Sequence, residues 1–376
     1  MTDAPKIIGI TGNIATGKSV VGHMLANSGG LEIDADVVAN RMLYPSGPAY
    51  ESVIEAFGEA ILISDGQISR DKLGQIVFSD TEKLHRLEEL IHPAVTAAIQ
   101  ARIEMTSQPF VIIEAIKLLE SSLVDICDAI WVSQASVDHQ IERLMTYRGL
   151  ARKQALSRIK AQPPQEEKLN RATVVINTEG SYKDTWLQVQ DALNDKIRID
   201  NGQKEIQQNQ IREGIIPNAN ALSNKELEEF WQGWVGIEPE SLYSSLGSKI
   251  FLPFIDQDHL RSLLLWNNWN FTAMPRKWIA EKTKDLLPEF FFDIFPAHVM
   301  RQQCELILIS KELSHHYEIN PEEHGYYLFK INELTYPAWQ EAARKISPDH
   351  DDRLWIKILS QPVEAEQLKN LSLIHI

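Results

Sequence analysis

Cysteine is scarce in this sequence, and basic residues are outnumbered by acidic ones. Its 376 residues include only two cysteines, Cys127 and Cys304, which stand far apart in the chain. Two distant thiols give neither a disulfide framework nor the spacing of a metal site, and they favour a reducing compartment, the cytoplasm. The formal net charge of −15 argues against a nucleic-acid partner, although a local basic pocket could still hold a nucleotide.

Long apolar runs are absent as well. The most apolar short stretch is EFFFDIF, far below the roughly 18 residues that a membrane-spanning helix needs, and the N-terminus shows no signal-peptide pattern. We therefore expect no membrane span and no membrane partner. Hydrophobic residues still make up 44% of the chain, which allows a sizeable core, and the length is comfortable for two domains.

The first half of the chain alternates short apolar runs with longer helical periodicity, the pattern of a parallel sheet covered by helices. We predict strands over residues 6–11, 31–33, 110–115, 129–133 and 173–177, and helices over 18–27, 49–57, 70–100 and 137–169. Residues 198–223 are polar and rich in Gln and Asn, which is typical of a linker. The predicted first domain is therefore α/β and covers residues 1–197.

The second half, residues 224–370, is richer in tryptophan, which we interpret as a packed core. We expect helices over 224–234 and 281–303 and strands over 249–254, 261–267 and 304–310, giving a second α/β or α+β domain. The last six residues, 371–376, read LSLIHI and resemble a translated sequencing adaptor, which predicts that the natural chain is cut near Asn370. The alternative is a frayed apolar tail, and resequencing the junction decides between the two.

A phosphate-loop pattern is the most informative motif. Residues Gly12 to Ser19 read GNIATGKS and follow the apolar run KIIGIT directly. A strand that leads through a glycine-containing turn into a helix aims backbone N–H groups and the positive helix end at one point, where a triphosphate can sit. Lys18 would reach the β and γ phosphates, and Ser19 would hold Mg²⁺. The cofactors expected are thus ATP and Mg²⁺, with nucleotide contacts from Gly12, Asn13, Ile14, Ala15, Thr16, Gly17, Lys18, Ser19 and Val20.

Acidic residues follow the second predicted strand, in the sequence Asp34-Ala35-Asp36. In a doubly wound sheet the strand ends at one edge line the ligand crevice, so we expect a carboxylate here to lie opposite the phosphate loop. Phosphoryl transfer to an alcohol needs a carboxylate that orients or deprotonates the hydroxyl, and we assign this role to Asp36. The alternative is an aspartate that only begins the helix near Val37.

Several motifs together resemble the dephospho-coenzyme A kinase family. They are GNIATGKS, IDAD, PSGP, DGQISRDKLGQIVF, LEELIHP and QIERLMTYRGLARKQALSRIKAQPPQEEK, and the resemblance runs over residues 6–195. It implies a P-loop kinase sheet with a helical lid and an acceptor-binding region. It also implies that the chain transfers the γ-phosphoryl group of ATP to the ribose 3′-hydroxyl of dephospho-CoA, the last step of coenzyme A biosynthesis.

The resemblance extends to single residues on the acceptor side. It places Asp36 at the catalytic carboxylate, and Arg70 and His92 in the helical region that holds the acceptor. For His92 the alternative is a buried structural histidine.

Three arginines, Arg143, Arg148 and Arg158, fall in the lid segment of the family. Guanidinium groups there would neutralise the charge that spreads over the transferred phosphoryl group. We expect Arg143 to act in catalysis with Lys18, Arg143 and Arg148 to contact ATP, and Arg158 to contact the acceptor. The alternative for each arginine is a solvated helix face or a surface ion pair.

Some positions depart from the family pattern. Asn13 and Ala15 stand where glycines are common, and Ala15 is tolerable only if its backbone is not required at positive φ. The segment that holds Lys117 lacks the family's Pro-Leu-Leu run, and Thr173 and Asn177 replace the usual aspartates. These changes keep two alternatives open: another P-loop nucleoside or nucleotide kinase, and a non-catalytic module that senses CoA or a nucleotide.

The second half faintly resembles a degenerate acetyltransferase-like domain, but the glycine-rich turn that would hold a pyrophosphate is missing. We therefore expect a regulatory or oligomerisation role for it rather than a second activity. The sequence leaves open the oligomeric state and the choice between ATP and GTP.

Overall fold

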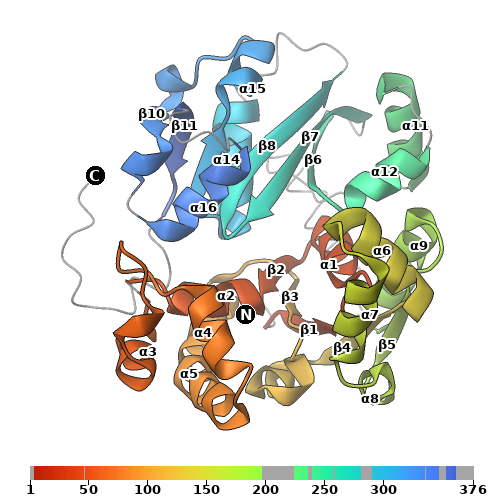
Figure 1. Cartoon of the computed structure of the whole chain (residues 1–376). Helices are drawn as coiled ribbons and strands as arrows, with labels where there is room; N and C mark the ends of the chain where they lie inside the picture. The colour runs from red at the N-terminus through yellow and green to blue at the C-terminus, as the bar shows by residue number, and fades with distance from the viewer. Residues whose placement is uncertain are drawn as a thin grey trace. The chain divides into compact units, whose positions relative to one another are not determined.

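The computed structural model describes residues 4–45, 47–196, 224–235, 239–256, 259–280, 290–334, 336–346 and 353–360 (Figure 1). The predicted linker over 198–223 and the predicted adaptor-derived tail over 371–376 lie outside the described residues. None of the helices in these ranges is long and apolar enough to cross a membrane.

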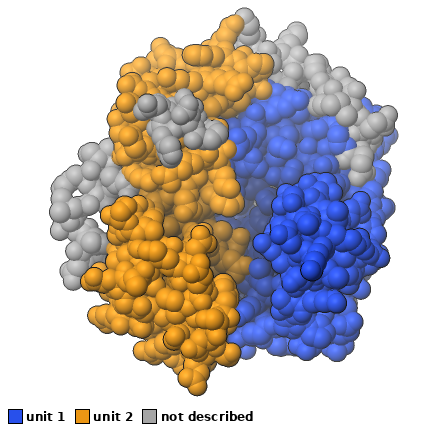
Figure 2. All heavy atoms as spheres, viewed as in Figure 1, with its two compact units in different colours: residues 1–33, 107–268, 273–302 blue, residues 34–106, 269–272, 303–376 orange. Residues whose placement is uncertain are grey.

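The chain folds as two compact units, which Figure 2 shows in different colours. Unit 1 comprises residues 1–33, 107–268 and 273–302, and unit 2 comprises residues 34–106, 269–272 and 303–376. Each unit therefore combines segments from both halves of the sequence. The domain boundaries at residues 197 and 224 stay a prediction.

Unit 1 contains the predicted parallel sheet, with strand order β2-β3-β1-β4-β5. The central strand β1 pairs in parallel with β3 and β4, as in Ile8 with Ile112 and Ile10 with Trp131, and β4 pairs in parallel with β5. The α/β fold class is confirmed, and the predicted strands differ from the observed ones by one residue at most. Their bounds are β1 Lys6–Thr11, β2 Leu31–Asp34, β3 Phe110–Glu114, β4 Ala129–Gln134 and β5 Val174–Asn177.

The lid region of unit 1 is three helices where the sequence predicted one over 137–169. They are α6 Val137–Arg148, α7 Arg152–Lys160 and α8 Gln165–Asn170. Gly149 ends α6 with φ 62, and the Pro163-Pro164 pair precedes α8, where a proline cannot continue a preceding helix. The first helix, α1 Lys18–Asn27, has the predicted bounds, and α9 Tyr182–Lys196 follows the last strand of the sheet.

Residues after the predicted linker also belong to the core of unit 1. The helices α11 Asn224–Val235 and α12 Pro239–Leu246 contribute Leu227, Trp231 and Leu246 to one apolar cluster with Met24 of α1 and Trp186 of α9. This cluster fixes the helix that follows the phosphate loop.

Polar contacts reinforce this packing on α1. The Asn27 amide nitrogen donates to the carbonyl oxygens of Leu246 and Lys249, both at 2.9 Å, and its amide oxygen accepts from the Phe251 N–H at 2.8 Å. Residues 246–251, from the second half of the sequence, thus stabilise the helix that follows the phosphate loop.

Three further strands of unit 1 lie in the order β8-β7-β6: β6 Ile250–Asp256, β7 His259–Trp269 and β8 Thr272–Ala280. The sequence analysis did not predict β8, whose run TAMPRKWIA is interrupted by Pro275. Of the helix predicted over 281–303, the described part is a π-helical turn, Phe290–Ile294, followed by α14 Phe295–Arg301. The packed-core interpretation is confirmed for Trp231, Trp266 and Trp278, which are buried.

Unit 2 combines helices of the first half with strands of the second. The helices are α2 Ala35–Met42, α3 Tyr50–Phe57, α4 Arg70–Val77, α5 Thr81–Met105, α15 Lys311–His316 and α16 Pro337–Ile346. The strands, in antiparallel order β10-β11-β9, are β9 Leu306–Ile309, β10 Tyr327–Lys330 and β11 Arg353–Ile358.

The helix predicted over 70–100 is two helices. A new helix begins at Asp80, whose carboxylate accepts from the backbone N–H groups of Glu82 at 3.0 Å and Lys83 at 3.3 Å. An aspartate in this position satisfies N–H groups that have no partner within the helix, so it starts a helix rather than continuing one. The α5 helix then continues through Pro93 to Met105.

Candidate active site

The phosphate loop connects β1 to α1 and contains left-handed backbone. Gly17, at the N-cap of α1, has φ 89, a conformation that glycine adopts at little cost. From the sequence, an alanine at position 15 was expected to be tolerable only if its φ were not positive. The structure contradicts this condition, because Ala15 has φ 59. A left-handed alanine costs roughly 1–2 kcal/mol. Its methyl group packs with Ile141 and Leu144 of α6, which offsets part of this strain.

The Lys18 side chain is buried over the loop and is 9% exposed. Its ammonium nitrogen donates to the Gly12 carbonyl oxygen at 3.0 Å. The cation is therefore held against the main chain of the loop, where the sequence predicted that it would meet phosphate oxygens.

A pair of carboxylates lies beside Ser19, and the sequence analysis did not single them out. The Ser19 hydroxyl donates to Glu114 Oε1 at 2.9 Å, from the end of β3. A side chain on Gly22 would place its Cβ 2.3 Å from Glu32 Oε1 and 3.4 Å from Glu114 Oε2. The absence of a side chain at Gly22 thus gives both carboxylates room next to α1.

The pKa of Glu114 is raised to about 7. Burial is the main cause because the charged form loses its hydration, and repulsion from Glu32 acts in the same direction. Lys18 and the Ser19 hydroxyl lower the pKa and partly offset these effects. Near neutral pH this carboxyl therefore changes its protonation state in response to nearby charge.

Replacing Glu114 with Gln is expected to stabilise the ligand-free protein at pH 8 by roughly 5 °C in Tm, and to change little at about pH 4. Folding raises the pKa of this carboxyl from 4.5 to about 7, so its contribution to stability is fully present below pH 4.5 and is lost as the pH rises to about 7. Thermal unfolding at both pH values measures this, with the exposed Glu166→Gln as control. An equal effect of Glu114→Gln at both pH values would contradict the raised pKa.

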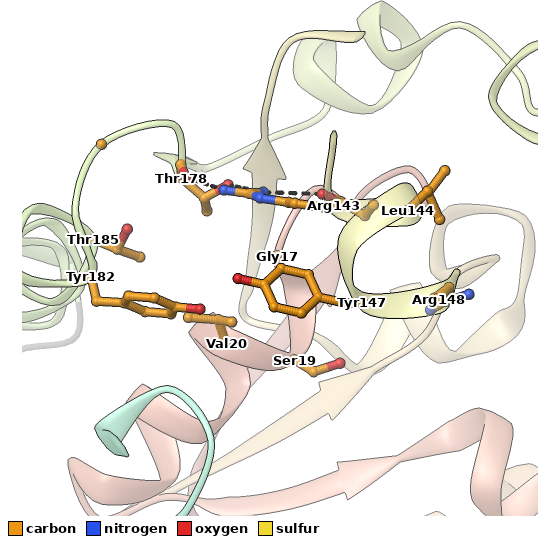
Figure 3. A pocket seen from close by; sticks show the side chains of 12 residues that line it. Gly17, Ser19, Val20, Arg143, Leu144, Tyr147, Arg148, Thr178, Tyr182 and Thr185 are labelled. Atoms are coloured by element: carbon orange, nitrogen blue, oxygen red, sulfur yellow. Dashed lines mark hydrogen bonds between the residues drawn. The ribbon is translucent and has the colours of Figure 1, made fainter. Parts of the chain in front are cut away.

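Arg143 of α6 makes three hydrogen bonds, one to the phosphate loop and two to Thr178. One terminal nitrogen donates to the Ala15 carbonyl oxygen and to Thr178 Oγ1, both at 3.0 Å, and the other donates to the Thr178 carbonyl oxygen. Figure 3 shows the bonds to Thr178. All three acceptors are uncharged, so they orient the guanidinium without neutralising its charge. A positive charge that is fixed in position in this way can bind the oxygen atoms of a phosphoryl group.

A cavity of about 480 Å³ opens beside the loop. In Figure 3 the Tyr147 and Tyr182 rings, from α6 and α9, extend into it next to Val20. Its wall combines cationic, hydroxyl and apolar groups and consists of Ala15, Gly17, Ser19, Val20, Arg143, Leu144, Tyr147, Arg148, Thr178, Gly180, Tyr182 and Thr185. Arg143 and Arg148, two of the predicted ATP ligands, thus line one space with the predicted loop residues.

Two glutamines of the lid region also hold the phosphate loop. The Asn13 N–H donates to Gln165 Oε1 at 2.9 Å, and the Ile14 N–H donates to Gln162 Oε1 at 2.6 Å. The sequence analysis missed these residues, since nothing in the local pattern QPPQ shows that its amides reach back to the loop.

The remaining predicted residues lie elsewhere. Arg158 is exposed on α7 in unit 1 and is not among the residues that line the cavity. In unit 2, Asp36 is exposed near the start of α2, and His92 is exposed on α5, so the buried structural alternative for His92 is wrong. The alternative role for Asp36, starting the helix, belongs to Asp34. The Asp34 carboxylate accepts hydrogen bonds from the N–H groups of Asp36 and Val37.

Arg70 lines a second cavity, of about 400 Å³, within unit 2. Its guanidinium lies 3.5 Å from the Glu341 carboxylate of α16. Tyr44 also lines this cavity, and burial together with the Glu341 charge raises the pKa of its hydroxyl to about 12. Glu341 is a further residue that sequence reasoning missed, because it comes from the second half of the chain.

Known proteins are similar in sequence to the N-terminal half of the chain. The dephospho-CoA kinase family model matches residues 6–184. A dephospho-CoA kinase of Carboxydothermus hydrogenoformans is 44% identical over 186 residues, which are 49% of this chain and 90% of that protein. The chain belongs to the dephospho-CoA kinase family. The N-terminal half of this dephospho-CoA kinase family member carries the kinase activity, and the resemblance drawn from the motifs is confirmed.

Solved structures resemble both halves of this family member. A crystal structure from Thermus thermophilus is 33% identical and covers 52% of this chain and 99% of its own, with a TM-score of 0.47. The second half is similar to acetyltransferases, among them an aminoglycoside 6′-acetyltransferase type Ii that is 11% identical. That structure covers 38% of this chain and 93% of its own, with a TM-score of 0.25. No activity is assigned to the second half on this likeness.

Proposed function

We propose that the chain binds Mg-ATP in the cavity beside the phosphate loop and transfers the γ-phosphoryl group to the ribose 3′-hydroxyl of dephospho-CoA. The observation that carries the proposal is the convergence of loop, Ser19 and two lid arginines on one cavity of about 480 Å³. Lys18 and Arg143 would stabilise the charge on the transferred phosphoryl group. The lid would keep water from competing with the acceptor.

The cavity also suits the rest of ATP. Tyr147 and Tyr182 offer aromatic faces on which a base can stack, while Arg148 adds positive charge on the lid side. Thr178 and Thr185 supply hydroxyl groups. We assign the nucleoside part of ATP to this wall and the phosphates to the loop amides.

A magnesium ion would be held by Ser19 and Glu114. Both side chains present oxygen atoms, the donor that Mg²⁺ prefers, and the remaining positions would be filled by phosphate oxygens and water. Bound Mg²⁺ would neutralise charge on the phosphates. Its proximity would also keep Glu114 ionised, against the raised pKa of that carboxyl.

Asp36 is the proposed group that orients or deprotonates the acceptor hydroxyl. Since Asp34 provides the helix cap, the cap does not account for a carboxylate at position 36. Arg70, His92 and Arg158 would bind the acceptor, as the family resemblance implies. We further propose a cytoplasmic location, from the two distant cysteines, and no nucleic-acid partner, from the net charge of −15.

A coupled ADP-release assay tests the function. With the full chain and Mg-ATP, dephospho-CoA should give one ADP and one coenzyme A per turnover, with the new phosphate on the 3′ position. Nucleoside monophosphates serve as competing acceptors. Preference for a nucleoside monophosphate over dephospho-CoA would refute the proposal.

Replacing Glu341 with Gln is expected to lower KM for dephospho-CoA about 2- to 5-fold, the value of one partly exposed ion pair. In the native protein the Glu341 carboxylate forms an ion pair with Arg70. An anionic group of the acceptor must therefore compete with Glu341 for the Arg70 guanidinium. Steady-state kinetics measure the change, with the exposed Glu312→Gln as control. An unchanged or higher KM for dephospho-CoA would show that Arg70 does not bind the acceptor.

A further inference from the structure

A buried charge cluster in unit 2 joins the two halves of the sequence. Glu305, just before β9, is 1% exposed, and Arg41 of α2 and Arg102 of α5 are 0% exposed. One terminal nitrogen of Arg41 lies 2.8 Å from each Glu305 carboxylate oxygen, and Arg102 Nη2 lies 3.1 Å from Oε1. A single carboxylate from the second half therefore serves two arginines from the first.

Neighbouring groups complete the cluster. The Trp339 indole N–H of α16 donates to Glu305 Oε2 at 3.2 Å, and Arg41 Nε donates to the Tyr336 hydroxyl at 3.2 Å. The Phe271 ring lies 3.4 Å from the Arg102 guanidinium carbon and 4.9 Å from that of Arg41. These contacts stabilise the two cations in a site that excludes water.

The energetics of such a cluster are strongly asymmetric. Each buried ion loses its hydration, so removing the Glu305 charge would leave two buried guanidinium groups without this counter-charge. Glu305, Tyr336 and Trp339 all lie outside the family match over residues 6–184. Helices α2 and α5 thus bury two arginines that both pair with a carboxylate from outside the family match.

We propose that residues 303–346 complete the fold of the acceptor-binding region, and that Glu305 is a positioning residue for Asp36. Arg41 and Asp36 lie on the same short helix, α2 Ala35–Met42. Anchoring Arg41 in the cluster therefore fixes the direction in which α2 presents Asp36. The positioning part of this inference rests on the proposed function of Asp36.

The test uses the full chain with Glu305→Gln, which preserves size and removes charge. We expect Tm to fall by roughly 10 °C and hydrogen exchange in α2 and α5 to increase. We expect kcat/KM for dephospho-CoA, measured well below Tm, to fall about 30-fold or more, while Kd for Mg-ATP stays within about 2-fold. The exposed Glu312→Gln serves as a control and should change none of these.

Two further variants keep the test decisive if Glu305→Gln does not fold. Trp339→Phe removes the indole N–H together with part of a buried ring system, keeps all three charges of the cluster, and should lower kcat/KM about 3- to 10-fold. The triple variant Arg41→Met, Arg102→Met and Glu305→Met replaces the charges with apolar groups and should recover most of the lost Tm and part of the lost kcat/KM.

Wild-type Tm and exchange in Glu305→Gln would overturn the structural part of the proposal, and so would a triple variant less stable than Glu305→Gln. An unchanged kcat/KM in Glu305→Gln and Trp339→Phe would overturn the positioning part. If the wild-type chain does not phosphorylate dephospho-CoA, the proposed function fails instead, and Tm and hydrogen exchange still test the role of residues 303–346.

Discussion

Asp36→Asn should lower kcat with dephospho-CoA by about 10²- to 10⁴-fold, the range that a positioned general base contributes. Asparagine has the same shape but cannot accept the hydroxyl proton. Because Asp36 is exposed near the start of α2, its loss should leave Tm nearly unchanged. Kd for Mg-ATP should also stay the same, since no ATP ligand is altered. Rapid-quench measurement of coenzyme A formation in a single turnover reports this step directly.

Asp34→Asn is the matched control for Asp36. Asparagine caps a helix about as well as aspartate, so this variant should retain both Tm and kcat within a small factor. The two variants differ by two positions and remove the same charge. Equal losses in both would show that a general acidic character at the start of α2, and not Asp36, is what the reaction needs.

Lys18→Ala should reduce kcat by about 10²- to 10³-fold, the loss seen when one preorganised donor to a developing charge is removed. Its ammonium group is held 3.0 Å from the Gly12 carbonyl oxygen, so it is in place before ATP arrives. Removing this cation also removes a charge that lowers the pKa of Glu114. The pH at which kcat/KM for Mg-ATP reaches its plateau should therefore move upward in this variant.

Lys6→Ala is the control for Lys18, because Lys6 is an exposed lysine on β1 whose ion pair with Asp128 is at the surface. It should change kcat very little. A Lys18→Ala enzyme with kcat close to the wild-type value would show that the GNIATGKS loop is not the phosphate site.

Local sequence was enough to predict the backbone elements around the phosphate loop. The pattern GNIATGKS fixes a strand, a turn and a helix within one short segment, and the structure has β1 and α1 with the predicted bounds. Arg143 and Arg148 could be predicted only from the family resemblance, because an arginine on a helix has no local mark of function. The conformation of Ala15 was not predictable, since its φ depends on how α6 packs against the loop.

Contacts between distant residues account for what the sequence did not show. Glu114 ends an apolar strand, and only the fold brings it to Ser19, 95 positions earlier. Arg41 and Glu305 are separated by 264 positions, and each alone resembles an ordinary surface charge in the sequence. Helix ends were missed for a more local reason, because Asp80 and Gly149 were read as parts of longer periodic stretches.

The proposed reaction is tested most directly by the product that the full chain makes from dephospho-CoA and ATP labelled at the γ-phosphate. We expect the label on the ribose 3′ position of coenzyme A, at one equivalent per ADP released, and we expect this transfer to be lost in both Asp36→Asn and Lys18→Ala. Label that remains in ATP, or that appears on water or on a nucleoside monophosphate in preference to dephospho-CoA, would contradict it.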